Sequence, residues 1–225
     1  MSNRVVVVTG GRGALGAAVV KEALADGLSV ASIDHGSGDA PDEAVLEIGG
    51  VDLTDPAQAS RAIEAVVARF GRIDALLNIA GGFVWQTADD ASPAWDRMYA
   101  LNVKTALNAS RAALPHLKAS SEGRIVNVGA NGALKSAAGM GAYAASKSGV
   151  HRLTESLAEE LKSTRVTVNA VLPSILDTAQ NRADMPDADP AEWVQPADLA
   201  RVMLFLASPE SRAITGALIP VTGKV

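Results

Sequence analysis

Apolar runs and amphipathic segments follow one another along the chain and predict strands and helices in alternation. Arg4 to Val8 is a continuous β-branched run, typical of a parallel strand buried on both faces, and Ala17 to Ala25 then takes up helical spacing. Further strands are predicted at Leu28–Ile33, Ile48–Leu53, Ile73–Ile79, Arg124–Val128, Val166–Leu172 and Ala217–Val221, and further helices at Ala57–Phe70, Pro93–Lys118, around Tyr143 to Leu161, and at Pro196–Ala207. Without an internal repeat or linker, residues 1–225 are expected to form a single α/β domain.

Composition excludes several classes of function. The 225 residues are 48% apolar and 20% charged, with a net charge of −5 and scattered basic residues, so there is no electrostatic footprint for nucleic acid. The absence of cysteine excludes disulfides and thiolate metal sites. The three histidines are far apart and are expected in solvated or helix-end positions, with no metal site: His35, His116 and His151.

The start of the chain goes directly into a strand pattern, without a targeting leader. No apolar run approaches the roughly 18 residues of a membrane span. These two features predict a soluble, cytoplasmic protein with no membrane partner.

A glycine-rich turn, Thr9 to Gly16, separates the first strand from the first helix. In that context glycines permit a tight turn, let a pyrophosphate approach the backbone and aim helix N-terminal amides at its charge. The alternative is a plain strand-to-helix turn. The predicted cofactor contacts here are Gly10, Gly11, Arg12, Gly13, Ala14, Leu15 and Gly16.

The second strand closes with Asp34, at the distance where an acidic residue accepts hydrogen bonds from an adenosine ribose. Its carboxylate would repel a 2′-phosphate, so we predict NAD(H) as the cofactor, with NADP(H) as the alternative. Arg12 favours that alternative, because a guanidinium near the loop can hold a phosphate. Asp52 and Leu53 could contact an adenine edge, or Asp52 could cap the helix beginning near Pro56.

Small residues follow the fourth strand and would leave room for a ribose or nicotinamide at the crevice of the sheet. The expected contacts there are Asn78, Ala80 and Gly81. Asn102 interrupts the apolar pattern of the long helix at its predicted break, near Leu101. A buried Asn needs hydrogen-bond partners, whereas the simpler reading of Asn102 is a kinking or capping residue.

Tyr143 and Lys147 are four residues apart in a predicted helix, so phenol and ammonium point to one side. A nearby cation favours the phenolate, and such a tyrosine can exchange a proton with an atom whose carbon exchanges a hydride. The same spacing also occurs by chance on many surface helices. After the sixth strand, the composition of residues 179–195 changes to Asp, Pro, Ala and Met, which suggests a mobile flap over the crevice.

Taken together, these motifs resemble the short-chain dehydrogenase/reductase family: the Thr9–Gly16 turn, Asn78 to Gly81, Asn102, and Tyr143 with Lys147. The resemblance implies a Rossmann-like, doubly wound, seven-stranded parallel sheet with helices on both faces, and a homodimer or homotetramer. It implies that Tyr143, Lys147 and Asn102 are catalytic, that Tyr143 and Lys147 also contact the cofactor, and that Lys147 holds the nicotinamide ribose. The carboxamide would be fixed by Pro173, Ile175 and Thr178.

The sequence departs from this pattern at Ala14, usually glycine, and at Ala130, usually the serine whose hydroxyl donates to a substrate carbonyl. Removing one such donor costs on the order of 3–4 kcal/mol. The dihydropteridine reductases, which the chain resembles more closely, also lack the serine; the resemblance lies in Gly10–Gly16, Val30–Asp34, Ala80–Gly82, Gly129–Ala130, Gly139–Tyr143, Leu176–Thr178, Asn181, Arg182, Met185, Pro186 and Trp193.

This resemblance implies NADH-dependent reduction of a quinonoid dihydropteridine or a similar flat, electron-poor substrate, on which Trp85 or Trp193 could stack. Two alternatives remain open. One is a carbonyl or 3-oxoacyl-thioester reductase in which Asn131 or a water replaces the serine. The other is a dinucleotide-binding protein without useful turnover.

Overall fold

The strands form one seven-stranded parallel sheet in the order β3-β2-β1-β4-β5-β6-β7. The computed structural model describes residues 4–38 and 44–224. β1 lies inside the sheet between β2 and β4, with Val6 opposite Val30 of β2 and Ala75 of β4. The predicted doubly wound sheet is confirmed, with strands at Val5–Thr9 (β1), Ser29–Ile33 (β2), Val45–Ile48 (β3), Ala75–Asn78 (β4), Arg124–Val128 (β5), Thr167–Pro173 (β6) and Leu218–Val221 (β7).

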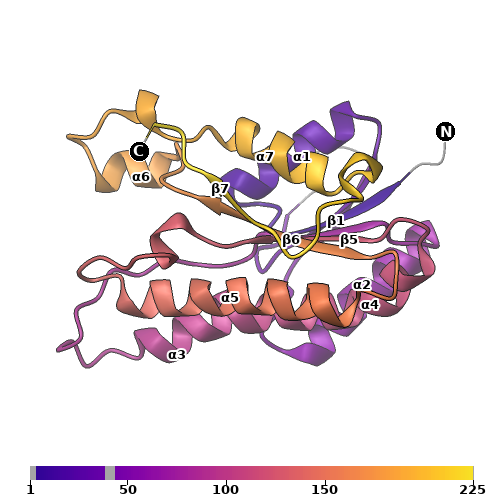
Figure 1. Ribbon diagram of the computed structural model, residues 1–225, viewed down its shortest axis with the longest axis horizontal. Coiled ribbons are helices and arrows are strands. Elements are labelled where there is room, and N and C mark those ends of the chain that lie inside the picture. The colour runs from indigo at the N-terminus through magenta and orange to yellow at the C-terminus, as the bar shows by residue number, and fades with distance from the viewer. Residues whose placement is uncertain (1–3, 39–43, 225) are drawn as a thin grey trace.

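Helices cover both faces of the sheet (Figure 1). On one face lie α1 (Ala14–Ala25) and α7 (Pro196–Leu206), and on the other lie α2 (Pro56–Phe70), α4 (Thr105–Ala119) and α5 (Gly141–Glu160). The short helices α3 (Ala94–Tyr99) and α6 (Ala179–Asp184) complete the set, together with single 3₁₀ turns at Asn131–Ala133, Pro190–Glu192 and Pro209–Ser211.

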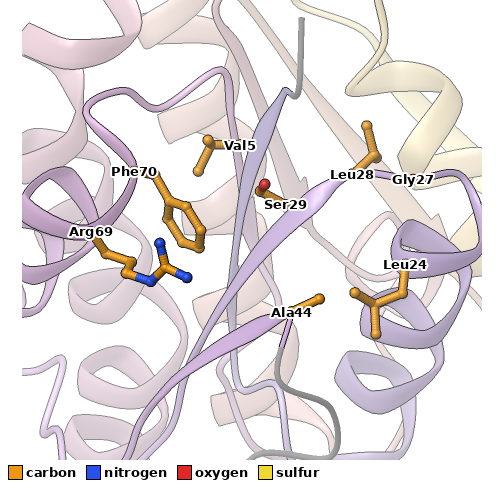
Figure 2. A pocket seen from close by; sticks show the side chains of 8 residues that line it. All are labelled: Val5, Leu24, Gly27, Leu28, Ser29, Ala44, Arg69 and Phe70. Carbon is orange, nitrogen blue, oxygen red and sulfur yellow. The ribbon is translucent and has the colours of Figure 1, made fainter. Parts of the chain in front are cut away.

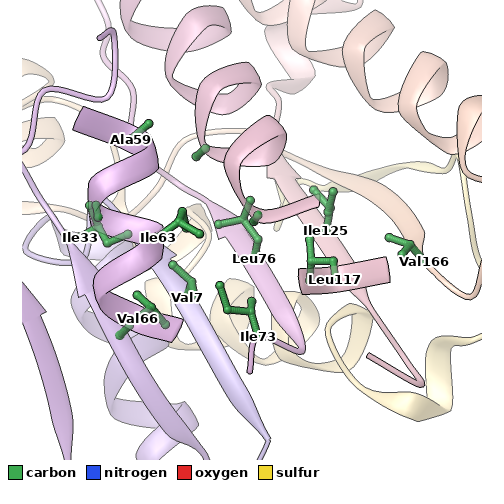
Figure 3. Packing of buried hydrophobic residues seen from close by; sticks show 14 of the residues in the cluster. Val7, Ile33, Ala59, Ile63, Val66, Ile73, Leu76, Leu117, Ile125 and Val166 are labelled. Carbon is green, nitrogen blue, oxygen red and sulfur yellow. The ribbon is translucent and has the colours of Figure 1, made fainter. Parts of the chain in front are cut away.

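Alternation along the buried strands divides the core into two layers. In β1, Val5 and Val7 face the layer under α2, α4 and α5, whereas Val6 and Val8 face the layer under α1 and α7. Figure 3 shows the first layer, where side chains from α2 and α4 meet those of the strands. Burial on both faces explains the unbroken β-branched run at the start of the sequence.

The third strand differs from its prediction at Ile48–Leu53. β3 is Val45–Ile48, and the chain leaves the sheet at Gly50, which has a φ of 70°. The pair Gly49 and Gly50 ends the strand because a left-handed turn follows at once. The apolar Leu53 that suggested a strand is instead a core residue ahead of α2.

The predicted break in the long helix is a turn of π-helix, Ala100–Lys104, between α3 and α4. Asn102 lies within it. Single π-helical turns inside α-helices are frequently found at functional sites, and this one lies beside the carboxyl end of β4, where Asn102 bonds Gly82.

A cavity of about 560 Å³ lies at the opposite, amino-terminal ends of β1 and β2 (Figure 2). Its lining residues are Val5, Leu24, Gly27, Leu28, Ser29, Ala44, Arg69 and Phe70. None of these residues belongs to the predicted site, which lies at the carboxyl ends of the strands.

Candidate active site

The turn after β1 brings the backbone unusually close to its neighbours. Gly10 has a φ of 68°, and a Cβ there would lie 2.9 Å from the backbone nitrogen of Ala80. A Cβ on Gly16 would lie 2.7 Å from the Cα of Gly11. Glycine is therefore required at Gly10 for the left-handed backbone and at Gly16 for the close approach of turn and helix, which is the geometry that fits a bound dinucleotide.

The other predicted residues of this turn divide by exposure. Arg12, Gly13 and Ala14 are exposed where α1 begins, so the free amides of the helix N-terminus are accessible to a pyrophosphate. Gly11 and Leu15 are buried, so they support the turn from the protein interior. The helix starts at Ala14 rather than at the predicted Ala17.

Thr9 makes a connection that the sequence pattern did not reveal. Its Oγ1 accepts hydrogen bonds from the backbone N–H groups of Ile79 (3.0 Å) and Ala80 (3.1 Å). The hydroxyl at the end of β1 thereby fixes the backbone that follows β4. The glycine turn and the small residues after β4 form one unit for this reason.

Asp34 lies at the carboxyl end of β2, next to the glycine turn. Its carboxylate accepts from the backbone N–H groups of Arg12 (3.0 Å) and Gly36 (2.8 Å). These bonds hold the carboxylate at the position where an adenosine ribose is expected. The Arg12 guanidinium is turned toward β3, where it pairs with Glu47 at 3.2 Å.

The structure does not favour the predicted adenine contact of Asp52 and Leu53. Asp52 Oδ1 accepts from the N–H and the hydroxyl of Thr54, so this carboxylate closes a turn. Leu53 is 5% exposed and belongs to the core. The predicted capping role falls to Asp55, whose side chain accepts from the N–H of Ala57 at the start of α2.

Beyond β4 the predicted residues differ in what they face. The Asn78 amide is 4% exposed and donates to Ser110 (3.0 Å) and Asn127 (2.8 Å), so it ties β4 to α4 and β5 instead of facing the crevice. Ala80 is partly buried and lies beside the glycine turn, whereas Gly81 is exposed and lies beside Lys147. Gly81 has room for a ligand because it lacks a side chain.

Asn102 is 2% exposed and is fully hydrogen-bonded. Its Oδ1 accepts from the N–H of Gly82 at 2.9 Å, while its Nδ2 donates to the carbonyl oxygen of Gly82 at 3.1 Å and to Ser146 Oγ at 2.9 Å. The amide thus links the π turn, the loop after β4 and α5. Asn102 organises the site through these three bonds.

Tyr143 and Lys147 lie on successive turns of α5, as the spacing predicts. The Lys147 ammonium donates to the carbonyl oxygen of Val128 at 2.8 Å and lies 3.5 Å from the place of a Cβ on Gly81. The ring of Phe83 meets the Tyr143 ring edge-on, with centroids 5.0 Å apart. The pair therefore stands at the carboxyl ends of β4 and β5.

Burial determines the acidity of both groups. It raises the pKa of Tyr143 to about 12 and lowers the pKa of Lys147 to about 8. The expectation of a lowered Tyr143 pKa is therefore wrong for this structure, because loss of solvation raises that pKa. Tyr143 keeps its proton throughout the neutral range, as a proton donor must.

Ala130 occupies the position where the family pattern has serine. A histidine side chain is hydrogen-bonded to its backbone. The imidazole Nε2 of His151 accepts a hydrogen bond from the Ala130 N–H at 3.3 Å. His151 is 2% exposed, so the prediction of a solvated or helix-end histidine is wrong here. Burial, with Arg152 and Lys147 as nearby cations, lowers its pKa and keeps it a neutral acceptor.

Residues after β6 form the remaining side of the crevice. Pro173 is buried at the strand end, and the carbonyl oxygen of Ile175 accepts from the N–H of Val194 at 2.9 Å. Thr178 Oγ1 accepts from the N–H of Asn181 and caps α6. The Thr178 hydroxyl hydrogen remains to serve a ligand, since a hydroxyl can accept and donate at once.

The segment predicted as a flap, residues 179–195, contains α6 and a 3₁₀ turn, and it is tied down at both ends. Leu176 pairs with Val194 in a parallel bridge, and Asp177 binds Arg182 and Gln195. Its motion stays a prediction.

The two tryptophans proposed to stack on a substrate differ in exposure. Trp193 is 5% exposed and packs in the interior, so its stacking role is wrong for this structure. Trp85 is 60% exposed, and its indole lies against Gly139, where a Cβ would overlap it. Phe83 and Trp95 are also more than half exposed, which leaves three aromatic side chains near the start of α5.

Across residues 4–38 and 44–224, no cluster of three or more His, Asp or Glu side chains is placed to hold a metal ion. No helix in the same ranges is long and apolar enough to cross a membrane.

Comparison with known proteins agrees with this geometry. A model of the short chain dehydrogenase family matches residues 4–189. The chain is 32% identical to 2-(S)-hydroxypropyl-CoM dehydrogenase 3 of Xanthobacter autotrophicus, over 99% of this chain and 96% of the relative. It is also 32% identical to the cyclic-di-GMP-binding biofilm dispersal mediator protein of Escherichia coli, over 99% and 97% of the two chains.

Among solved structures, 3-ketoacyl-(acyl-carrier-protein) reductase from Brucella melitensis complexed with NADH superposes with a TM-score of 0.87 at 27% identity, covering 99% of this chain and 98% of that one. Sequence, fold and the placement of Tyr143 and Lys147 lead to the same conclusion: the chain belongs to the short-chain dehydrogenase family of oxidoreductases.

Proposed function

We propose that the protein transfers a hydride from NADH to a flat, electron-poor conjugated substrate such as a quinonoid dihydropteridine, with Tyr143 as the proton donor. The observation that carries this proposal is Ala130. The Ala130 methyl group stands where a donating hydroxyl would polarise a carbonyl, and the backbone N–H of Ala130 already donates to His151. A conjugated, electron-poor ring can accept hydride without such a donor.

The roles of the chain's own groups follow from their positions. The N-terminal amides of α1 would bind the pyrophosphate, and Asp34 would bind the adenosine ribose. Lys147, close to Gly81, would hydrogen-bond the nicotinamide ribose. Bound NADH supplies the hydride and is oxidised to NAD⁺, so that the substrate gains one hydride and one proton. Tyr143 gives that proton to a ring nitrogen, and the Lys147 cation stabilises the phenolate left behind.

The exposed aromatic side chains support a flat substrate. Phe83 contacts the Tyr143 ring, and Trp85 and Trp95 lie against Gly139 and Gly141. Aromatic rings arranged around a proton donor favour a planar ligand that can stack or meet them edge-on.

The deciding experiment is steady-state NADH oxidation with quinonoid dihydropteridine, with NADPH in parallel. We expect turnover with NADH that falls at least a hundredfold in Tyr143→Phe, since a positioned acid contributes about 10²–10⁴-fold. The matched control is Tyr99→Phe, which removes the chain's other tyrosine hydroxyl, on α3 and half exposed. Binding of NADH without turnover above the uncatalysed rate would discard the pteridine substrate.

A second candidate is reduction of a carbonyl or 3-oxoacyl thioester, which the named activities of the Xanthobacter and Brucella proteins favour. Asn131, which follows Ala130 at the start of a 3₁₀ turn, would then replace the serine as donor. Ketone reduction that falls in Asn131→Ala would support it. Tight NADH binding with no oxidation across both substrate panels would instead support a non-catalytic binding role. By resemblance, we also propose a homodimer or homotetramer.

A further inference from the structure

Two carboxylates bind Arg12 at the adenosine end of the crevice, one at its backbone N–H and one at its guanidinium. Its backbone N–H donates to Asp34 at 3.0 Å, and its guanidinium pairs with Glu47 Oε1 at 3.2 Å. The guanidinium lies across the loop after β2, since its Cζ would be 2.8 Å from a Cβ on Gly38. It therefore lies close to where Asp34 would hold a ribose.

Glu47 is placed to retain this guanidinium. It lies on β3, paired in the sheet with Ser32 of β2, and its side chain is only 7% exposed, against 38% for Arg12. A carboxylate so poorly solvated depends on its ionic partner, and breaking such a pair leaves an uncompensated charge. If the Arg12 guanidinium bound a phosphate instead, the buried Glu47 carboxylate would lose its ionic partner.

We propose that Glu47 is a positioning residue that keeps the Arg12 guanidinium from binding the 2′-phosphate of NADP(H), and that it sets the preference for NAD(H) together with Asp34. The proposal rests on the proposed use of a nicotinamide dinucleotide. Asp34 acts by direct repulsion of the 2′-phosphate, whereas Glu47 acts through Arg12. Removing the charge of Glu47 leaves a guanidinium available where a 2′-phosphate needs a cation.

The test measures dissociation constants for NADH and NADPH by fluorescence titration, without a substrate. Four proteins form a double-mutant cycle: wild type, Glu47→Gln, Arg12→Ala, and the double variant. Glu160→Gln, an exposed carboxylate at the end of α5, controls for net charge. Thermal unfolding of each variant verifies that it is folded.

We expect Glu47→Gln to tighten NADPH binding by about threefold to tenfold, as for one screened charge close to a phosphate. NADH binding should stay within about twofold, and Glu160→Gln should change neither. In the Arg12→Ala background, the gain from Glu47→Gln should shrink to less than half. The affinity for adenosine 2′,5′-bisphosphate should change across the variants as the affinity for NADPH does, and the affinity for AMP should change as that for NADH does.

Two results would overturn the proposal. One is an unchanged ratio of NADPH to NADH affinity in folded Glu47→Gln, which would make the pair purely structural. The other is an equal gain with and without Arg12, which would show that Glu47 acts by direct repulsion. Wild-type protein that binds neither dinucleotide would refute the proposed function itself, and this inference with it.

Discussion

His151 and Gly129 occupy complementary space in this fold. A Cβ on Gly129 would lie 2.6 Å from the Nε2 of His151, the atom that accepts a hydrogen bond from the Ala130 N–H. The imidazole from α5 therefore fills the place of a side chain at the end of β5 and fixes the backbone of the next residue. The Gly-Ala pair and the buried histidine are one structural unit.

Gly129→Ala is expected to lower the free energy of unfolding by about 1–3 kcal/mol, because the added methyl has no room beside His151. The loss should be smaller when the same change is made in His151→Ala, where the ring is gone. Urea unfolding of the two single variants and the double variant measures this coupling. Gly132→Ala is the control, since its Cβ would meet only the flexible end of Met140 at 3.4 Å. Equal losses at both glycines would contradict the role of the imidazole.

Ala130→Ser should restore the hydroxyl donor that the family pattern has at this position. We expect kcat/KM for simple ketones to rise by about a hundredfold to a thousandfold, which is what such a donor is worth elsewhere. Turnover of a quinonoid dihydropteridine should change by less than about threefold, since that ring needs no carbonyl donor. The measurement is kcat/KM for both substrates, determined on the same preparation of each protein. A variant that loses pteridine turnover without gaining on ketones would oppose the proposed role of Ala130.

The charge of Lys147 should control the pH dependence of reduction. Because burial lowers its pKa to about 8, Lys147 is an ammonium below that pH and neutral above it. Tyr143, with a pKa of about 12, keeps its proton across the same range. The value of kcat/KM for reduction should therefore fall as pH rises through about 8, because it reports the free enzyme.

In Lys147→Met the rate should be low at every pH and the inflexion near pH 8 should disappear. Lys162→Met, at an exposed position paired with Glu159, should keep the wild-type profile. An inflexion near pH 8 that survives in Lys147→Met would assign the titration to another group.

Asp177 is expected to protect residues 179–195, the segment after β6, from proteolysis. Its carboxylate accepts from Arg182 Nη2 at 2.7 Å and from Gln195 Nε2 at 2.9 Å, and these bonds lower its pKa to about 2. Asp177→Asn removes the ion pair with Arg182 and weakens the hydrogen bond from Gln195, which joins the two ends of the segment. Limited proteolysis with mass spectrometry should then show faster cleavage between residues 184 and 190.

Gln180→Ala is the matched control, because Gln180 pairs with Asp184 within α6 alone. It should leave the cleavage rate near that of the wild type. Equal rates for Asp177→Asn and wild type would show that the bridge between Leu176 and Val194 holds the segment without the ion pair.

The sequence by itself determined the α/β fold, the parallel sheet, the glycine turn and the helical pair Tyr143 and Lys147. These features depend on local patterns, namely β-branched runs, helical spacing and glycine at a left-handed position, which a linear sequence records directly. The break at Asn102 was also predictable, because a polar residue interrupts an apolar face. The end of β3 was missed because Leu53 is a core residue outside any strand, and its apolar side chain looked like part of the strand.

Only the tertiary structure decided what surrounds those groups. It turned Arg12 to Glu47, placed His151 behind Ala130, buried Trp193 and raised the Tyr143 pKa that the Lys147 spacing was expected to lower. Each of these results depends on residues distant in the chain that meet in space, or on loss of solvation. Burial and long-range contacts are set by how the elements pack, and no local pattern of residues records them.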